Sequence, residues 1–401
     1  MKKRYLILTH GIDSIGGGQL YVASKINYLK SNGWEVNLFA YIDGKVILPT
    51  LKVYEQNIIY ELIHHPLSYT ASLRNAILDR LSAECDENTI IESNSIMLSL
   101  WGELLAEKLK CKHLFYNINE TSKCPKPYLD YYRFKLYRNE FKGITDKSIP
   151  YFFSDLVTIN PTQDYYLDAI YDLKQVEDYN YALSDTFDHN SLTIGIVGRL
   201  DKPFVLHVTK ELVKYFSIKD CRFNIVYIGG AAMGSNIERT LINELSVLKN
   251  VNVHFAGYLY PMPRNLVRCF DVCISSSGAV KSIAKEKILT ISIDANDLKP
   301  IGIFGVTTYN SLYREEEEVV SLDLLLDDVL FFNKFSADCI DYEEKEQDYS
   351  EKWKPHVDFM KESCSIKDYY VNFPKPGIFK IFIIRLLGIS LYKKIWQILK
   401  Q

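Results

Sequence analysis

Short runs of apolar, often β-branched residues recur along about the first 300 residues, and polar residues or glycines follow each run. Runs of this kind are typical of parallel strands that are buried on both faces. Apolar residues at helical spacing lie between many of them, as in 20–29, 98–109 and 205–216. The predicted strands are 5–9, 34–40, 89–92, 112–118, 156–159, 192–197, 222–228, 251–255, 271–274 and 290–294.

This alternation runs through two successive halves of the chain, and it predicts an α/β protein with two doubly wound, Rossmann-like domains. We expect a first domain over 1–188, a second over 189–365, and a tail over 366–401. A cleft between two such domains is the default ligand site. Further helices are predicted at 128–141, 236–248, 263–269 and 283–288, after Pro161, and from the start of the acidic run 315–318.

Three consecutive glycines, Gly16, Gly17 and Gly18, stand between the first predicted strand and the first predicted helix. Backbone amides at a helix entrance can approach an anion closely where no side chain intervenes. The spacing differs from the G-x-G-x-x-G of dinucleotide-binding sites. Taken alone, the three glycines are equally consistent with a flexible turn.

A cation pair follows the predicted strand 192–197. Gly198, Arg199 and Lys202 come first, and a helical pattern begins after Pro203. This arrangement suits a diphosphate, because amides at the helix start donate hydrogen bonds while the two cations neutralise charge. The alternative is an ordinary turn between strand and helix with two surface cations.

Composition narrows the class of protein. Hydrophobic residues make up 47% of the 401 positions and charged residues 24%, as in folded proteins and unlike disordered chains. The net charge of −3 argues against a general nucleic-acid binder, which would carry a basic excess. The 8 cysteines include no C-x-x-C pair and the N-terminal apolar run is too short for a signal peptide, so we expect a cytoplasmic protein.

The end of the chain is basic. Six Lys or Arg and no acid lie between Pro374 and Gln401, among apolar residues at nearly helical spacing. The charges exclude a membrane-spanning helix. A basic amphipathic helix suits an anionic membrane surface, which would make the protein peripheral on the inner face of the cell membrane. The alternative, a closing helix packed on the first domain, remains open.

Several weak motifs occur in a fixed order. They are Gly16–Gly18; Gly198-Arg199-Leu200; Tyr227-Ile228-Gly229-Gly230; His254-Phe255-Ala256-Gly257-Tyr258; and Asp271 to Ser277, which leads to Glu286. Together they resemble a GT-B glycosyltransferase, most of all the large retaining group (family four) that uses nucleotide-diphosphate sugars. The resemblance covers roughly residues 1–310.

The resemblance implies that the sugar donor lies on the second domain. Arg199 would contact the leaving phosphate with help from Lys202, and Gly16 to Gly18 would approach the phosphates from the first domain. Glu286 matches the second acid of a Glu-x7-Glu pair that contacts donor-sugar and ribose hydroxyls. The remaining donor contacts would come from Gly198, Gly229, Gly230, Gly257, Tyr258, Ser276, Ser277 and the amides that follow.

Three positions depart from the family pattern. The first acid of the Glu-x7-Glu pair falls on Gly278, and the usual second cation falls near Phe204 or Val205. Lys202 or Lys281 is the candidate replacement for that cation. The family's first-domain histidine has no clear match, and Glu120 in that neighbourhood is a candidate base.

The resemblance implies transfer of a sugar to a glycan or lipid-linked glycan acceptor in surface polysaccharide assembly. Retaining members let the leaving phosphate accept the proton of the acceptor. We expect no metal, since the sequence has no Asp-x-Asp motif, and no cofactor besides the donor substrate. Two alternatives remain: a non-catalytic GT-B partner or scaffold, which Gly278 favours, and a nucleotide-sugar epimerase.

Overall fold

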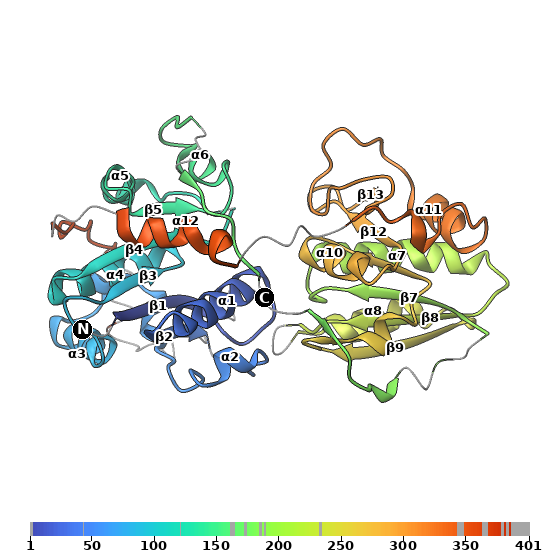
Figure 1. The fold of residues 1–401 in the computed structure, drawn as a ribbon, viewed down its shortest axis with the longest axis horizontal. Coiled ribbons are helices and arrows are strands. Elements are labelled where there is room, and N and C mark those ends of the chain that lie inside the picture. Colours follow the sequence, from blue (N-terminus) through green and yellow to red (C-terminus); the bar gives the residue numbers. More distant parts are fainter. Residues whose placement is uncertain are drawn as a thin grey trace. The chain divides into compact units, whose positions relative to one another are not determined.

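The computed structural model describes residues 3–42, 44–120, 122–160, 165–171, 175–183, 187, 190–231, 235–342, 349–362, 368–377, 381 and 385. The chain divides into two compact units, Met1–Asp172 with Gln347–Gln401 and Leu173–Glu346. Each unit contains a largely parallel sheet with helices on both faces (Figure 1). The α/β fold class that the sequence predicts is therefore confirmed.

The first unit contains five parallel strands in the order β2-β1-β3-β4-β5. β1 lies between β2 and β3 in this order, and its apolar run is buried on both sides; Leu6, Ile7 and Leu8 have no exposed surface. The strands are β1 (Lys3–Gly11), β2 (Trp34–Ile42), β3 (Ile90–Ser93), β4 (Lys112–Asn117) and β5 (Phe141–Gly143). The helices are α1 (Gly17–Ser31), α2 (Pro49–Lys52), α3 (Ala71–Ser82), α4 (Ile96–Leu109), α5 (Leu129–Tyr137), α6 (Ser148–Phe153) and α12 (Tyr349–Glu362).

In the described residues, the main sheet of the second unit has six strands in the order β13-β12-β11-β7-β8-β9, of which β13 alone runs antiparallel to its neighbour. A separate two-stranded sheet pairs β6 (Val176–Glu177), which precedes β7, with β10 (Met262–Pro263), which follows β9. The strands are β7 (Leu192–Val197), β8 (Phe223–Ile228), β9 (Val251–Gly257), β11 (Val272–Ser275), β12 (Thr290–Ile293) and β13 (Pro300–Ile303). The helices are α7 (Pro203–Ser217), α8 (Ile237–Leu245), α9 (Arg264–Val267), α10 (Gly278–Lys285) and α11 (Leu322–Leu330).

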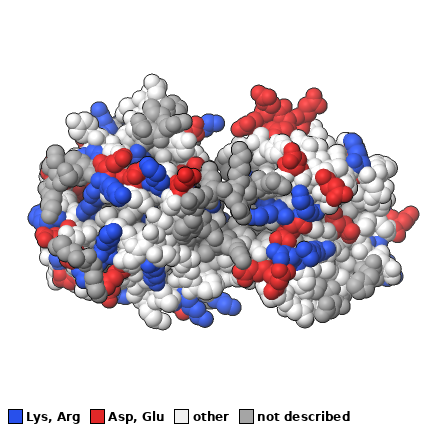
Figure 2. All heavy atoms as spheres, in the orientation of Figure 1, with Lys and Arg blue, Asp and Glu red and all other residues white. Residues whose placement is uncertain are grey.

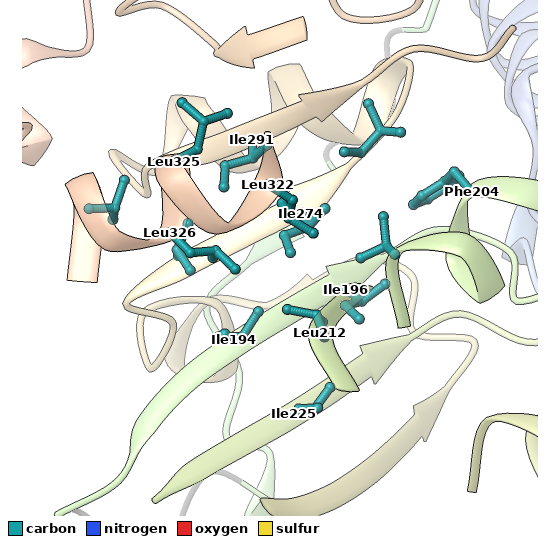
Figure 3. Close-up of a cluster of buried hydrophobic side chains, with 14 of the residues drawn as sticks. Ile194, Ile196, Phe204, Leu212, Ile225, Ile274, Ile291, Leu322, Leu325 and Leu326 are labelled. Carbon is teal, nitrogen blue, oxygen red and sulfur yellow. The ribbon is translucent and has the colours of Figure 1, made fainter. Parts of the chain in front are cut away.

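One core of the second unit lies between its sheet and the helices α7 and α11. Ile194 and Ile196 of β7 point to this face together with Ile225, Ile274 and Ile291 from the neighbouring strands (Figure 3). The helices contribute Phe204, Leu212, Leu322, Leu325 and Leu326. Gly195 lies on the opposite face, where an added Cβ would come within 2.5 Å of the Phe270 ring. The alternation of large residues and glycine along β7 thus matches two differently packed faces.

The predicted domain boundary at 188/189 differs from the division in the structure, which falls at 172/173. Residues before 188 already pack on the second unit: Val176 pairs with Met262, and Phe187 belongs to the core that Phe270 and Met262 form. At the other end, α12 belongs to the first unit and not to a second domain that continues to residue 365. Trp353 of α12 stacks on Tyr28 of α1 with ring centroids 4.7 Å apart.

Two predictions of secondary structure in the first unit are wrong. Residues 156–159 form no strand; Leu156 and Ile159 instead pack as loop residues against an aromatic core. The predicted helix 128–141 ends at Tyr137, and its last apolar residue, Phe141, begins the short edge strand β5. Both errors arise because a short apolar run does not distinguish strand, helix and buried loop. The helix predicted after Pro161 would begin at residues outside the described ones, and the described residues 165–171 that follow form no α-helix.

Two predictions in the second unit also need correction. The acidic run 315–318 is a loop, in which the Glu317 carboxylate accepts hydrogen bonds from Thr308 and Asn310. Burial alone would raise the pKa of Glu317, but these hydrogen bonds lower it to about 2. The helix predicted at 283–288 begins earlier, at Gly278, so Ser277 is its N-terminal flanking residue.

The basic tail falls mainly outside the described residues, which include 368–377, Ile381 and Arg385 of it. Arg385 donates hydrogen bonds to the carbonyl oxygens of Ser68 (3.2 Å) and Tyr69 (3.1 Å). The described portion therefore contacts the first unit. Within the described ranges, no helix has both the length and the apolar character needed to cross a membrane. On the face shown in Figure 2, Lys and Arg are interspersed with Asp and Glu.

Candidate functional site

The carboxyl ends of β7 and β11 define the candidate site of the second unit. In the sheet, β7 has β8, the next main-sheet strand along the chain, on one side and β11 on the other. The chain continues from β7 to β8 and from β11 to β12, which lie in opposite directions across the sheet. The loops after β7 and β11 therefore turn to opposite faces, and ligands of doubly wound sheets bind in the crevice that such a reversal opens. The Ser275 hydroxyl, at the end of β11, donates to the Val197 carbonyl oxygen at the end of β7 (2.6 Å).

Glycines hold the loops after β7, β8 and β9 against one another. Gly229 has φ +149°, and a Cβ there would lie 1.9 Å from the Gly198 carbonyl oxygen. Gly229 donates to the Gly257 carbonyl oxygen at 2.8 Å, and a Cβ on Gly230 would meet the Tyr258 ring at 2.3 Å. The structure thus brings Gly198, Gly229, Gly230, Gly257 and Tyr258 together at one sheet edge. Close approach of backbones explains the glycines there before any ligand is considered.

Arg199 and Lys202 lie in the loop between β7 and α7. The Arg199 side chain is 43% exposed, and its Nε lies 3.3 Å from Asp201 Oδ1. Lys202 is less exposed and its amine lies over the Phe204 ring, 6.0 Å from the centroid. Burial and then the charge of Arg199 lower the pKa of Lys202. Two adjacent cations, one of them poorly solvated, favour an anion beside this loop.

The loop after β11 supplies amides on the other side of the same sheet edge. Ser277 has φ +70°, uncommon for a residue with a side chain, and its amide donates to the Ser311 carbonyl oxygen at 2.5 Å. Buried Ser276 precedes it, and the amides of the first turn of α10 follow it. Lys281 is exposed one turn further along α10. A Cβ on Gly278 would meet no atom within 4 Å, so this position has room for a larger side chain.

Glu286 lies at the opposite end of α10 from Gly278. Its carboxylate is 13% exposed and accepts two hydrogen bonds from Arg264, at 2.7 Å from Nε to Oε2 and 3.2 Å from Nη2 to Oε1. The prediction that Glu286 contacts a donor therefore concerns a carboxylate that already has one partner. Arg264 is not among the residues predicted from the sequence. The chain has 47 Lys and Arg, and only the contact with Glu286 in the folded structure distinguishes Arg264 from the others.

In the first unit, Gly16, Gly17 and Gly18 lie where α1 begins, directly after β1. Gly16 is extended and flanks the helix. A Cβ on Gly17 would lie 3.1 Å from the Tyr171 hydroxyl, and one on Gly18 would lie 2.8 Å from Ile118 Cδ1. The reversal of strand order in this sheet falls between β1 and β3, so the glycines stand at its ligand-binding edge as well.

Glu120 follows β4 at this edge and lies near the same tyrosine. Burial raises the pKa of Glu120. The pKa of Tyr171 is also raised, mainly by burial and next by the charge of Glu120. The structure therefore brings Glu120 and the glycine loop to the same edge of the first sheet. A carboxyl group with a raised pKa has the property required of a general acid or base.

A buried polar network in the first unit is not among the predictions from the sequence. The Glu92 carboxylate accepts from the Tyr5 hydroxyl (2.6 Å), the Tyr21 hydroxyl (3.1 Å) and the Asn94 amide (3.1 Å). Lys25 lies 3.4 Å from it, with almost no exposed surface. Lys25 falls on the buried face of α1, among apolar residues. A lysine at such a position indicates a buried partner, and the sequence alone could have revealed it.

A second buried cluster has the distances of a nucleophile triad. Ser93 Oγ lies 2.5 Å from His113 Nε2, and His113 Nδ1 lies 2.8 Å from Glu103 Oε2. Burial and then the charge of Lys135 lower the pKa of His113 to about 4. Ser93 has no exposed surface, so a substrate has no access to this hydroxyl and it cannot act as a nucleophile. Among the described residues, no group of three or more His, Cys, Asp or Glu could hold a metal ion.

No protein-family model matches the chain, and no curated protein sequence matches it. Solved structures do. The HepE protein of Anabaena in complex with UDP-glucose matches with TM-score 0.54 and 13% identity, over 84% of this chain and 92% of that one. A Listeria monocytogenes protein described as a UDP-N-acetylglucosamine 2-epimerase matches with TM-score 0.53 and 11% identity, over 93% and 100%.

A glycosyltransferase from Rickettsia africae matches with TM-score 0.52 and 12% identity, over 98% of this chain and 99% of that one. At these identities the likeness is one of fold. The matches span both units of the chain, so the similarity is to the whole two-unit architecture. The chain has a GT-B-like fold built from two Rossmann-like units.

Proposed function

We propose that this protein is a nucleotide-sugar enzyme, and specifically a glycosyltransferase that moves a sugar from a nucleotide-diphosphate donor to a glycan or lipid-linked glycan. The observation that carries the proposal is the pairing of Arg199 and Lys202 with the first turn of α10 at the strand reversal of the second sheet. Cations on one side and helix amides on the other suit a diphosphate. The fold it shares with HepE, which binds UDP-glucose, supports a UDP-sugar as donor.

The chemistry follows from the charge that develops in transfer. As the bond between the anomeric carbon and the phosphate oxygen breaks, negative charge collects on the leaving diphosphate. Arg199, Lys202 and the amides after Ser277 supply fixed positive potential at that oxygen. Removal of one such donor from an enzyme typically costs about 10²–10³ in rate. In the retaining reaction that we propose, the leaving phosphate takes the proton of the acceptor, so no dedicated base is needed.

Epimerisation of the donor sugar is the second candidate. The similarity in fold to a protein described as a UDP-N-acetylglucosamine 2-epimerase favours it. Gly278 favours it too, because it stands where the resemblance places an acid that contacts the donor sugar in transferases. Glu120, with its raised pKa, would then be the group that exchanges a proton with the sugar.

Product analysis separates these candidates. The intact protein is incubated with UDP-glucose and with UDP-N-acetylglucosamine, first alone and then with a lipid-linked glycan acceptor. Transfer predicts release of UDP that depends on the acceptor, whereas epimerisation predicts a new UDP-sugar without any acceptor. Nucleotide binding with neither product would identify a non-catalytic protein and contradict both.

Arg199→Ala tests the carrying observation in the same assay, and we expect turnover to fall about 10²-fold or more. Arg222→Ala is the matched control. Arg222 is also an exposed arginine of the second unit, but it stands at the amino end of β8, on the opposite sheet edge. Equal losses in both variants would refute the assignment of the site to the carboxyl edge.

A further inference from the structure

A pocket of about 260 Å³ opens at the amino edge of the first sheet. Ile90 and Lys112, which are the first residues of β3 and β4, line it together with Tyr369 from the segment after α12. Glu120 and the glycine loop of this unit stand at the carboxyl edge instead. Ligand pockets typically measure about 300–1,000 Å³, so this pocket suits a small molecule.

The pocket is lined by more acids than cations. His113, which also lines it, adds no charge near neutral pH, because burial and then the charge of Lys135 lower its pKa to about 4. The charged lining residues are the acids Glu87, Glu103, Glu140 and Asp368 and the cations Lys112, Lys135 and Arg138. The lining as a whole is therefore negative.

The most deeply buried cation of the pocket is satisfied within the protein. The Lys135 ammonium group has three N–H donors. It donates to Glu103 at 2.9 Å, to Glu140 at 2.6 Å and to the His113 carbonyl oxygen at 2.7 Å. Burial alone would raise the pKa of Glu103, but the Lys135 charge and the hydrogen bond from His113 lower it to about 2, so this acid is ionised. Lys135 therefore has no donor left for a ligand.

The other two cations also bond to groups of the protein. Arg138 Nη2 donates to Glu140 Oε1 at 3.0 Å. The Lys112 amine donates to the carbonyl oxygen of Met360, near the end of α12, at 3.0 Å. An anionic ligand would have to compete with these contacts and would meet repulsion from the acids of the lining.

The acids, in contrast, retain capacity to accept hydrogen bonds. An ionised carboxylate has about four lone-pair sites on its two oxygens. The two bonds from Lys135 and Arg138 occupy one site on each oxygen of Glu140, which is itself buried. Glu87 and Asp368 are exposed, and within the described ranges of the chain neither forms an ion pair. The pocket thus combines negative charge with acceptor sites that the protein itself does not fill.

We propose that this pocket binds the primary ammonium group of a small ligand, which brings a positive charge and three N–H donors to Glu87, Glu140 and Asp368. Hydrogen bonds between an ammonium group and a carboxylate are about twice as strong as those between neutral groups. Amino sugars and amine-bearing lipid head groups both carry this group. The proposal concerns the opposite sheet edge from the candidate site residues of this unit, and it does not depend on the nucleotide-sugar function.

The test measures dissociation constants of glucosamine and ethanolamine for the intact protein by ligand-observed NMR titration at about pH 6.5, where both amines are protonated. Glucose and ethylene glycol are their neutral counterparts, in which a hydroxyl group replaces the amine. We expect each amine to bind at least about tenfold more tightly than its counterpart, because it alone forms charge-assisted hydrogen bonds with the acids.

Glu87→Gln combined with Asp368→Asn removes two charges from the pocket and keeps the size of both side chains. We expect this double variant to bind either amine about tenfold more weakly than the wild type does. Glu55→Gln is the matched control, because Glu55 is an exposed acid of the first unit that does not line the pocket. It should bind as the wild type does. Thermal melting verifies that each variant folds; if the double variant does not, the two single variants decide by the same criterion.

A preference for the amines that the double variant loses and Glu55→Gln keeps would support the proposal. The relative affinity of glucosamine and ethanolamine would then indicate whether an amino sugar or a lipid head group supplies the ammonium. No binding of either amine to the wild type, or equal binding of the neutral counterparts, would overturn the proposal. Equal losses in Glu55→Gln and in the double variant would show a non-specific attraction to acids and would likewise overturn it.

Discussion

At the scale of single residues, Lys202 shows how the loop after β7 is prepared for an anion. Burial and the nearby Arg199 charge lower its pKa below the ordinary 10.5 because both disfavour the protonated amine. A bound diphosphate reverses that preference. Binding is therefore coupled to protonation of Lys202, and affinity is greatest below the lowered pKa of the free protein.

The expected result is a loss of UDP affinity as the pH rises through the lowered pKa of Lys202. Lys202→Arg should bind as the wild type does near neutral pH and lose less affinity above it, because a guanidinium stays protonated. Dissociation constants measured between about pH 7 and pH 10 check this. The ratio of the two proteins' constants cancels titration of the ligand, and a ratio independent of pH would exclude the proton coupling.

Gly229 and Gly278 lie at the same sheet edge but under different constraints. Gly229→Ala places a Cβ 1.9 Å from the Gly198 carbonyl oxygen in a backbone with φ +149°, so we expect a loss of at least about 2 kcal/mol. Gly278→Ala meets no atom and begins a helix, so its effect on stability should be within about 0.5 kcal/mol of zero or favourable. Thermal melting of the two variants compares them; equal melting temperatures would contradict this packing of the loops.

At the scale of elements, α12 follows the second unit along the chain but belongs to the first unit. Trp353 is completely buried and stacks on Tyr28, and His356 lies 3.5 Å from buried Lys25. Trp353→Ala should cost the first unit about 3–5 kcal/mol, whereas Lys354→Ala, one residue on and exposed, should cost little. Unfolding followed separately in each unit, by hydrogen exchange, should show the loss in the first unit only. A loss confined to the second unit would contradict the placement of α12.

The sequence predicted most elements and missed those whose character depends on distant partners. The strands β1, β7 and β8 are apolar on both sides, and this pattern is local, so it was predictable. β5 contains only Phe141–Gly143, too short for a period to emerge. The predicted start of α10 is too late, because the serines and glycine of 275–278 are typical of a loop. In the structure β11 ends at Ser275 and α10 already begins at Gly278.

Prediction of the candidate site followed the same division. Arg199, the glycine loops and Ser277 are found from sequence because each follows an apolar strand within a few residues. Arg264 can be recognised only from its contact with Glu286, 22 residues away in the sequence. Glu92 likewise can be recognised only from its contacts with Tyr5 and Lys25. Groups that act through contacts between separate elements leave no periodic pattern for the sequence to reveal.

At the scale of the whole molecule, both units place candidate site residues after the first strand of their main sheet. β1 precedes the glycines Gly16 to Gly18, and β7 precedes Arg199. In each sheet the order of strands reverses beside that strand, so the same topological rule selects both loops. The fold itself does not choose between transfer and epimerisation, because the same architecture supports different reactions through different site residues.

The central claim is that the loop after β7 binds a diphosphate through Arg199. The most direct test is the dissociation constant of UDP measured by calorimetry for the wild type, Arg199→Ala and Arg222→Ala at one salt concentration. We predict measurable binding to the wild type and to Arg222→Ala, and binding at least about tenfold weaker to Arg199→Ala. Equal affinity of all three proteins, or no binding by any of them, would contradict the claim.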